Sequence, residues 1–202
     1  MNSVSAGVAV SRGPAAHPAP LREVMSLFAT GVTVLSVGGE DIHGMTANAF
    51  TSVSLDPPSV LCSVAHSAVM YRAITSAGHF GVSIMEAGQE GLARFFADKK
   101  RPLGPGQFAG VDWAPGPRTG APLLGGALAW LECEVLAAHD IGDHTVFIGG
   151  VVNSSRGQGA QGLLFFGGAF DRTDTPSGPS SPSGPSGPSS SAPSASSASS
   201  SR

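Results

Sequence analysis

The sequence predicts a mainly β protein with short helices, in which antiparallel strands close into a barrel. Roughly seven runs of apolar and β-branched residues lie between turn signals, whereas only three short segments have the spacing of an amphipathic helix. Strands and helices do not alternate in the β–α–β order of a doubly wound parallel sheet, and this favours the antiparallel barrel.

The first expected element is a short amphipathic helix at residues 21–30, where apolar residues recur at helical spacing and Gly31 ends the pattern. Residues 32–37 are apolar and β-branched, which is typical of a strand. The next expected strand, residues 42–55, stops at a double proline.

In the middle of the chain, strand-like and helix-like segments follow one another. The helical segments carry apolar residues on one face, and the strand-like segments are short apolar runs bounded by turn residues. The expected elements are strands at 60–64 and 80–85 and helices at 68–77 and 88–100.

A Gly/Pro-rich excursion, residues 102–122, precedes the last strands. We expect Phe108, Val111 and Trp113 to anchor it, because they are its large apolar side chains. The last expected strands are residues 128–138, 145–152 and 163–166.

The two ends of the chain differ in composition from the middle. Residues 173–202 are almost wholly Ser, Pro, Gly and Ala. Fixing the backbone costs about 1–2 kcal/mol per residue, and this segment has almost no apolar side chains whose burial would offset that cost. We therefore expect a disordered tail at 173–202, a flexible N-terminus at 1–20 and one folded domain over 21–172.

The low charge of the chain argues against several classes of partner. Only 12% of the residues are charged and the net charge is −3, so no basic field attracts nucleic acid. No apolar run approaches the ~20 residues that span a bilayer, which argues against a membrane partner. A charged fraction this low favours a well-buried core or a large subunit interface.

The N-terminal residues and the cysteines predict a cytoplasmic protein. Residues 1–20 lack the charged and apolar regions of a secretory signal. Cys62 and Cys133 lie in separate apolar runs without a C-x-x-C partner, so we expect buried free thiols rather than a disulfide or a metal site.

Residues 157–162 match the G-x-G-x-x-G pattern of dinucleotide-binding sites. That pattern works only between a strand and a helix whose N-terminus holds the pyrophosphate. Here the strand-like run 163–166 follows directly, with no helix behind it. We interpret residues 157–162 as a loop.

The best candidate for a binding site is the segment 44–58, which reads GMTANAFTSVSLDPP. Small side chains let a flat ligand approach the backbone, and the hydroxyl and amide groups are neutral hydrogen-bonding partners. A metal would need a cluster of charged ligands instead. The segment therefore predicts a cradle for a planar, polar molecule, and no metal site is expected.

A histidine lies at a turn that opens the expected strand 145–152. In Gly142-Asp143-His144 the turn can project the imidazole over a ligand, while Asp143 fixes its orientation. A histidine with only a structural role is the alternative.

One basic cluster, Lys99-Lys100-Arg101, follows the expected helix 88–100. These cations either offset the negative end of the helix dipole or contact a phosphate. Ser67 can cap the expected helix at Ala68, and it can also reach the same phosphate. The two roles do not exclude each other.

Taken together, these segments resemble the short-chain flavin reductases, which are the reductase components of two-component flavin-dependent monooxygenases. The resemblance extends over nearly all of residues 21–172 and implies a split antiparallel β-barrel of Greek-key type that binds FMN. It is carried by residues 31–34, 44–64, 79–83, 142–144 and 163–170.

The resemblance implies a flavin site assembled from several segments. Residues 46–49 would line the isoalloxazine edge, and Ser63 and Ala65 would border the ribityl chain. His144 would lie near the nicotinamide as the catalytic residue. The implied cofactor-binding residues are Thr46, Ala47, Asn48, Ala49, Ser63, Ala65, Ser67, Phe95, Lys100 and Arg101.

The activity that the resemblance implies is NAD(P)H:flavin oxidoreduction. A hydride passes from NADH (or NADPH) to FMN (or FAD), and the reduced flavin goes to a partner monooxygenase. Members of the family work as homodimers, and the tail at 173–202 is not part of the family pattern. A non-enzymatic FMN-binding electron carrier would use the same pocket and is the alternative.

Overall fold

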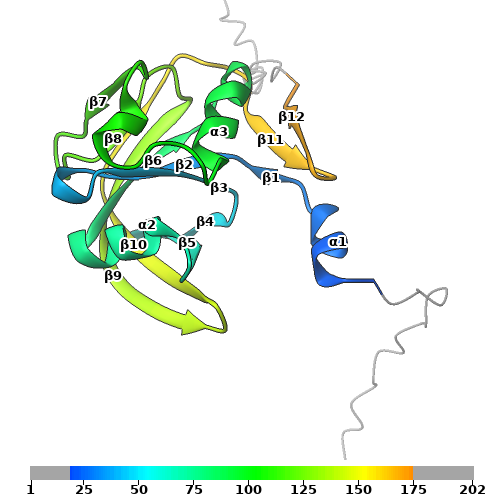
Figure 1. Ribbon diagram of the computed structural model, residues 1–202, viewed down its shortest axis with the longest axis horizontal. Helices are drawn as coiled ribbons and strands as arrows, with labels where there is room; N and C mark the ends of the chain where they lie inside the picture. The colour runs from blue at the N-terminus through cyan, green and yellow to red at the C-terminus, as the bar shows by residue number, and fades with distance from the viewer. Residues whose placement is uncertain (1–18, 175–202) are drawn as a thin grey trace, which may run out of the picture.

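The computed structural model describes residues 19–174, which form a mainly β structure around one large antiparallel sheet (Figure 1). The strands of this sheet are β2 (Thr33–Val37), β3 (His43–Ala47), β4 (Phe50–Leu55), β5 (Pro58–Ala65), β6 (His79–Ile84), β9 (Ala129–Ile141) and β10 (His144–Arg156). Their order in space is β3-β2-β6-β9-β10-β5-β4.

Smaller sheets and short helices complete the fold, so the predicted mainly β class is confirmed. One small sheet consists of β1 (Thr30–Gly31), β11 (Leu163–Phe166) and β12 (Ala169–Arg172), and the other of β7 (Trp113–Pro115) and β8 (Pro122–Leu124). The helices are α1 (Leu21–Ser26), α2 (Val69–Ala77), α3 (Glu90–Ala97) and the 3-10 turns η1 (Gly39–Asp41), η2 (Ala87–Gln89) and η3 (Gly104–Phe108). No helix in residues 19–174 has both the length and the apolar character needed to cross a membrane.

The large sheet has two edge strands, β3 and β4. The single strand expected at residues 42–55 is divided into these two, because β3 pairs with β2 while β4 pairs with β5. The chain changes partner at Asn48 and Ala49, a switch that local periodicity does not reveal. Within residues 19–174, strand pairing therefore leaves the expected closed barrel open between β3 and β4.

A long hairpin formed by β9 and β10 extends beyond the rest of the sheet (Figure 1). Its two-residue turn contains Gly142 at φ 60°, a left-handed conformation that glycine adopts without steric cost. On its other side β10 pairs with β5, and this register places His144 directly opposite Ala65.

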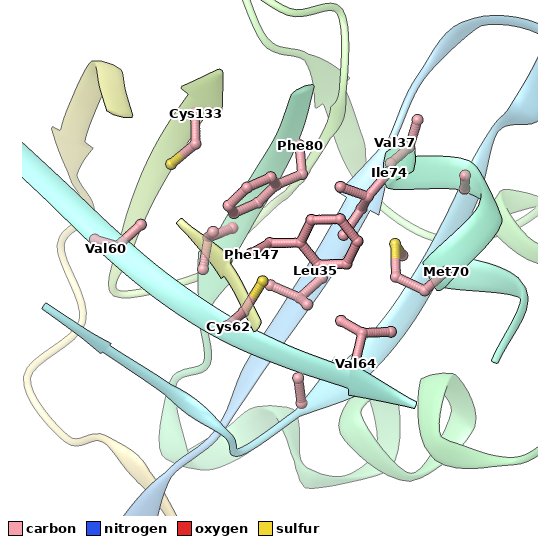
Figure 2. Close-up of a cluster of buried hydrophobic side chains, with 13 residues drawn as sticks. Leu35, Val37, Val60, Cys62, Val64, Met70, Ile74, Phe80, Cys133 and Phe147 are labelled. Carbon is pink, nitrogen blue, oxygen red and sulfur yellow. The ribbon is translucent and has the colours of Figure 1, made fainter. Parts of the chain in front are cut away.

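The hydrophobic core lies on both faces of β2, all of whose residues are buried. Successive side chains of a strand point to opposite faces. Leu35 and Val37 therefore enter one cluster and Val34 enters the other. Figure 2 shows the first cluster, in which Phe80 and Phe147 pack between the sheet and α2.

The helices are shorter than their periodicity predicts. The first, α1, ends at Ser26, because residues 30 and 31 already pair with β11. The helix expected at 88–100 is limited to α3, which follows the 3-10 turn η2 with its reciprocal cap between Glu86 and Gln89 and ends at Ala97. The short strand β12 was not predicted.

Several expectations about the irregular segments are confirmed. Phe108, Val111 and Trp113 anchor the Gly/Pro-rich excursion in the second core cluster. Residues 157–162 connect β10 to β11 as a loop, with no helix after them. Cys62 and Cys133 are buried free thiols, and burial raises the pKa of each to about 12, so both are neutral near pH 7.

The expected flexible N-terminus, 1–20, and disordered tail, 173–202, lie almost wholly outside the described residues. Thr173 lies within them, and its pairing with Gly162 follows β12. The Thr173 N–H donates to the Gly162 carbonyl (3.0 Å), and its hydroxyl accepts from the Gly162 N–H (2.8 Å).

Candidate functional site

The connection between the edge strands β3 and β4 lies between α3 and β5. The Thr46 hydroxyl donates to the Ala93 carbonyl of α3 (2.7 Å), and the Ser63 N–H of β5 donates to the Ala49 carbonyl (3.0 Å). These two bonds hold the ends of the connection. Asn48 and Ala49 are exposed between them, and the Asn48 amide has no partner within residues 19–174.

Ser63 and Ala65 share one face of the sheet with His144. Cys62 and Val64 of β5 are buried in the core, so the alternating residues 63 and 65 face the other way. Directly paired residues of adjacent strands lie on the same face, and His144 pairs with Ala65. The register of β5 and β10 thus brings together three predicted site residues that are distant in sequence.

The orientation of His144 is set by its neighbour. His144 Nδ1 lies 2.7 Å from an Asp143 carboxylate oxygen, and this hydrogen bond holds the pKa of Asp143 below its usual value. The Nδ1–H donates to the carboxylate, so a neutral His144 presents Nε2 as the free nitrogen. This is the geometry that the turn was predicted to create.

The basic cluster is divided between solvent and the protein interior. Lys99 and Lys100 are exposed after the end of α3. Arg101 instead turns back to the start of β3, where its guanidinium donates to the Asp98 carbonyl (2.7 Å) and to the Gly44 carbonyl. Arg101 is therefore the member of the cluster with a structural contact. This contact lies at the start of β3, whereas Ala47 lies at its end.

His43 lies beside this guanidinium and is buried. Its Nε2 is 3.1 Å from an Arg101 nitrogen, and its Nδ1 is 3.2 Å from the Gln107 amide nitrogen. Burial, and then the charge of Arg101, lower the pKa of His43 to about 4. His43 is therefore neutral near pH 7 and can accept a hydrogen bond from Arg101.

Three predicted residues remain, and one of them, Ala47, is buried in the first core cluster at the end of β3 rather than open to the site. Phe95 is half-buried on α3, where its ring packs edge-on against Phe96 at a centroid distance of 5.1 Å. Ser67 is exposed between β5 and α2. Its predicted role as a helix cap is wrong, because the N-cap residue of α2 is Ala68 and no side chain caps that helix.

A cavity of about 470 Å³ lies elsewhere, between the start of β3 and α2. Its walls include His43, Arg72 and Leu103 and none of the residues in the predicted site. The candidate site is therefore the surface formed by the β3–β4 connection, β5 and the start of β10.

Sequence reasoning did not predict the hydrogen-bonded group beside His144, which consists of Asp140, Thr145 and His66. The Thr145 hydroxyl donates to an Asp140 carboxylate oxygen (2.5 Å) and lies 3.0 Å from His66 Nε2. The contact between residues 145 and 140 could have been predicted from the two-residue turn at 142–143, because this turn sets the hairpin register that pairs them.

Known proteins similar to this chain share both its sequence and its fold. The model of the family "Flavin reductase like domain" matches residues 25–174. An NADH-dependent FAD reductase of Streptomyces globisporus is 52% identical over 152 residues, which cover 75% of this chain and 84% of that protein.

The solved structures that resemble this chain include two flavin reductases. The NADH:FAD oxidoreductase of Streptomyces globisporus C-1027, in complex with NAD and FAD fragments, matches with a TM-score of 0.72 and 48% identity over 78% of this chain and 93% of that one. BorF, the flavin reductase component of a bacterial two-component tryptophan halogenase, matches with a TM-score of 0.73 and 47% identity over 75% of this chain and 95% of that one. The chain belongs to the flavin reductase-like family, as its sequence motifs predicted.

Proposed function

We propose that this chain is an NADH-dependent flavin reductase that supplies reduced FMN or FAD to a partner monooxygenase. The observation that carries the proposal is the placement of His144, held by Asp143, on the same sheet face as Ser63 and Ala65. Membership of the flavin reductase-like family supports the same activity. The matches from Streptomyces globisporus are named for NADH and FAD, which supports these as donor and acceptor.

The residues of the β3–β4 connection suit a flavin. Ala49 and Ala65 leave room for a flat ring, and the Asn48 amide, which has no partner within residues 19–174, offers both donors and an acceptor to the ring edge. A flavin, when bound, accepts the hydride of the nicotinamide. The protein's part is to hold the two rings in contact and to keep water out.

Further residues belong to the same proposed site. Ser63 borders the ribityl chain and Phe95 forms part of the wall on α3. Ser67 and Lys100 are exposed and can reach a phosphate, for which a charge-assisted hydrogen bond supplies about 1.5–3 kcal/mol. Arg101 adds positive charge while it also fixes the start of β3.

In this proposal His144 orients the nicotinamide and exchanges no proton. Asp143 keeps Nδ1 occupied, so Nε2 faces the ligand. Hydride transfer requires no acid or base, which agrees with a site of mainly neutral groups.

The proposal also includes a split barrel, a cytoplasmic location and a homodimer. The open edge between β3 and β4 supports a split barrel, and the free buried thiols support a reducing, cytoplasmic setting. A homodimer is supported by α1, which carries exposed apolar side chains and buries none of its residues.

The test is a steady-state assay with all four combinations of FMN or FAD with NADH or NADPH. We expect oxidation of NADH that depends on added flavin, followed as loss of nicotinamide absorbance. If neither nicotinamide is oxidised with either flavin while FMN still binds, the chain is an electron carrier rather than a reductase.

A further inference from the structure

His66 forms hydrogen bonds with both residues that flank His144. Its backbone N–H donates to the Asp143 carbonyl (2.9 Å), and its side-chain Nε2 lies 3.0 Å from the Thr145 hydroxyl. One residue in the turn after β5 thus contacts the positions before and after the proposed nicotinamide-binding histidine.

The direction of these hydrogen bonds is determined by Asp140. A carboxylate only accepts, so the Thr145 hydroxyl donates its proton to Asp140 (2.5 Å). The hydroxyl must then accept from His66, which requires a proton on Nε2. Thr145 is 1% exposed, so water does not replace these partners.

His66 lies on the opposite side of the sheet from His144. Thr145 and His144 are consecutive in β10, so their side chains point to opposite faces. The His66 side chain contacts Thr145 and therefore lies on the face away from the candidate site. It therefore contacts the residues on either side of His144 from the face opposite the candidate site.

The contact of His66 lies at the tip of the β9–β10 hairpin. Pairing between β10 and β5 ends at His144 and Ala65, and the turn beyond it is exposed. The His66 ring packs against Tyr71 of α2 at 5.0 Å, and Tyr71 packs against Phe147 of the core at 6.2 Å. His66 therefore connects the hairpin tip to the hydrophobic core.

We propose that His66 is a positioning residue, which acts through Asp143 and Thr145 to hold His144 over the nicotinamide. This inference rests on the role proposed above for His144. In this inference, the Thr145 hydroxyl links the His66 side chain to the hairpin.

The test compares His66→Ala, His66→Gln and Thr145→Val in the full chain, with His79→Ala as the control histidine. His66→Ala and Thr145→Val remove the side-chain hydrogen bond, and we expect each to raise the KM for NADH about threefold to tenfold, the effect of one lost hydrogen bond. The KM for flavin should change less than twofold, as expected for a contact on the far face. His66→Gln keeps an N–H donor and should restore most of the affinity for NADH, and the control should leave both KM values unchanged.

A double-variant cycle separates positioning from general destabilisation. If His66 acts through His144, adding His66→Ala to His144→Ala should cause no further rise in the KM for NADH. An equal rise in both backgrounds, or a parallel rise in the KM for flavin, would overturn the inference. Because Thr145→Val preserves the shape of the side chain, it supplies the same test if His66→Ala fails to fold.

The cycle also distinguishes this inference from the proposed function. If His144→Ala raises the KM for NADH but His66→Ala and Thr145→Val do not, the positioning role of His66 is refuted and the role of His144 stands. If His144→Ala has no effect, the proposed role of His144 fails and the inference fails with it.

Discussion

At the scale of single residues, the hydrogen bond between His144 and Asp143 determines which imidazole nitrogen faces a ligand. Asp143 is fully exposed, so the bond competes with water and contributes orientation rather than stability. The His144 side chain is 44% exposed, which leaves Nε2 accessible.

Substitution of His144 by Ala should mainly impair the use of NADH. We expect kcat/KM for NADH to fall at least about tenfold, because the ring that orients the nicotinamide is lost, while the dissociation constant for flavin stays the same. Steady-state kinetics at saturating flavin and equilibrium flavin titration measure the two quantities. An unchanged kcat/KM for NADH in this variant would contradict the assignment.

At the scale of secondary-structure elements, a buried carboxylate fixes the Gly/Pro-rich excursion to β9. Glu132 is 0% exposed and accepts four hydrogen bonds, from the N–H groups of Arg118 and Thr119, the Thr119 hydroxyl and the Asn153 amide. Burial raises the pKa of this carboxyl, but the hydrogen bonds outweigh burial and hold it below its usual value. Gly116 packs so closely that a Cβ there would lie 2.4 Å from the carboxylate.

The pKa of Glu132 predicts how stability depends on pH. A carboxyl whose pKa is lowered by folding stabilises the protein above its unfolded pKa, and this contribution disappears as the pH falls through the folded value. We expect Glu132→Gln to lower the free energy of unfolding at pH 7 by about 1–3 kcal/mol, since an amide N–H₂ would face backbone N–H donors.

Urea unfolding at pH 7 and at progressively lower pH checks this prediction. The gap between wild type and Glu132→Gln should narrow as the pH falls. Glu134→Gln is the matched control, because Glu134 is an exposed carboxylate two residues along the same strand. A gap that stays constant with pH would show that the charge of Glu132 is not the cause.

The elements show which parts of a fold are readable from local sequence. The buried strand β2 and helices α2 and α3 were predicted because their side chains follow the period of the structure they form. The separation of β3 from β4 was not predicted, since it arises from a change of strand partner. The burial of Glu132 was missed for a similar reason, because the segment that covers it is distant in sequence.

The parts of the site that could be predicted are those whose contacts join residues close together in sequence. The turn at Gly142 and Asp143 was enough to foresee the orientation of His144. Arg101 was expected beside a phosphate, yet its guanidinium contacts Gly44, which only the packing of α3 against β3 determines. The contact of His66 with Thr145 likewise depends on the register between β5 and β10.

At the scale of the whole molecule, α1 stands apart from the body of the protein (Figure 1). It has six residues, too few for a stable isolated helix, and none is buried. Leu27 and Phe28, which follow it, are 68% and 66% exposed. Large apolar side chains exposed at adjacent positions are typical of an interface, and a second copy of the chain is the proposed partner.

The double substitution Leu27→Ser and Phe28→Ser should therefore weaken a dimer without unfolding the protomer. We expect light scattering after size-exclusion chromatography to give a dimer mass for the wild-type chain and a shift toward the monomer for the variant. Arg22→Ser, a polar change on the same helix, should leave the mass unchanged. A wild-type chain that is monomeric at all concentrations would contradict the proposed homodimer.

The open edge between β3 and β4 has a consequence for how long a flavin stays bound. A cofactor enclosed by a closed barrel can leave only when the barrel opens, whereas one that rests on an open edge can exchange with solvent directly. A reductase that passes its product to another enzyme benefits from a short residence time. In the proposed enzyme, the open edge would make flavin a substrate that turns over rather than a permanently held prosthetic group.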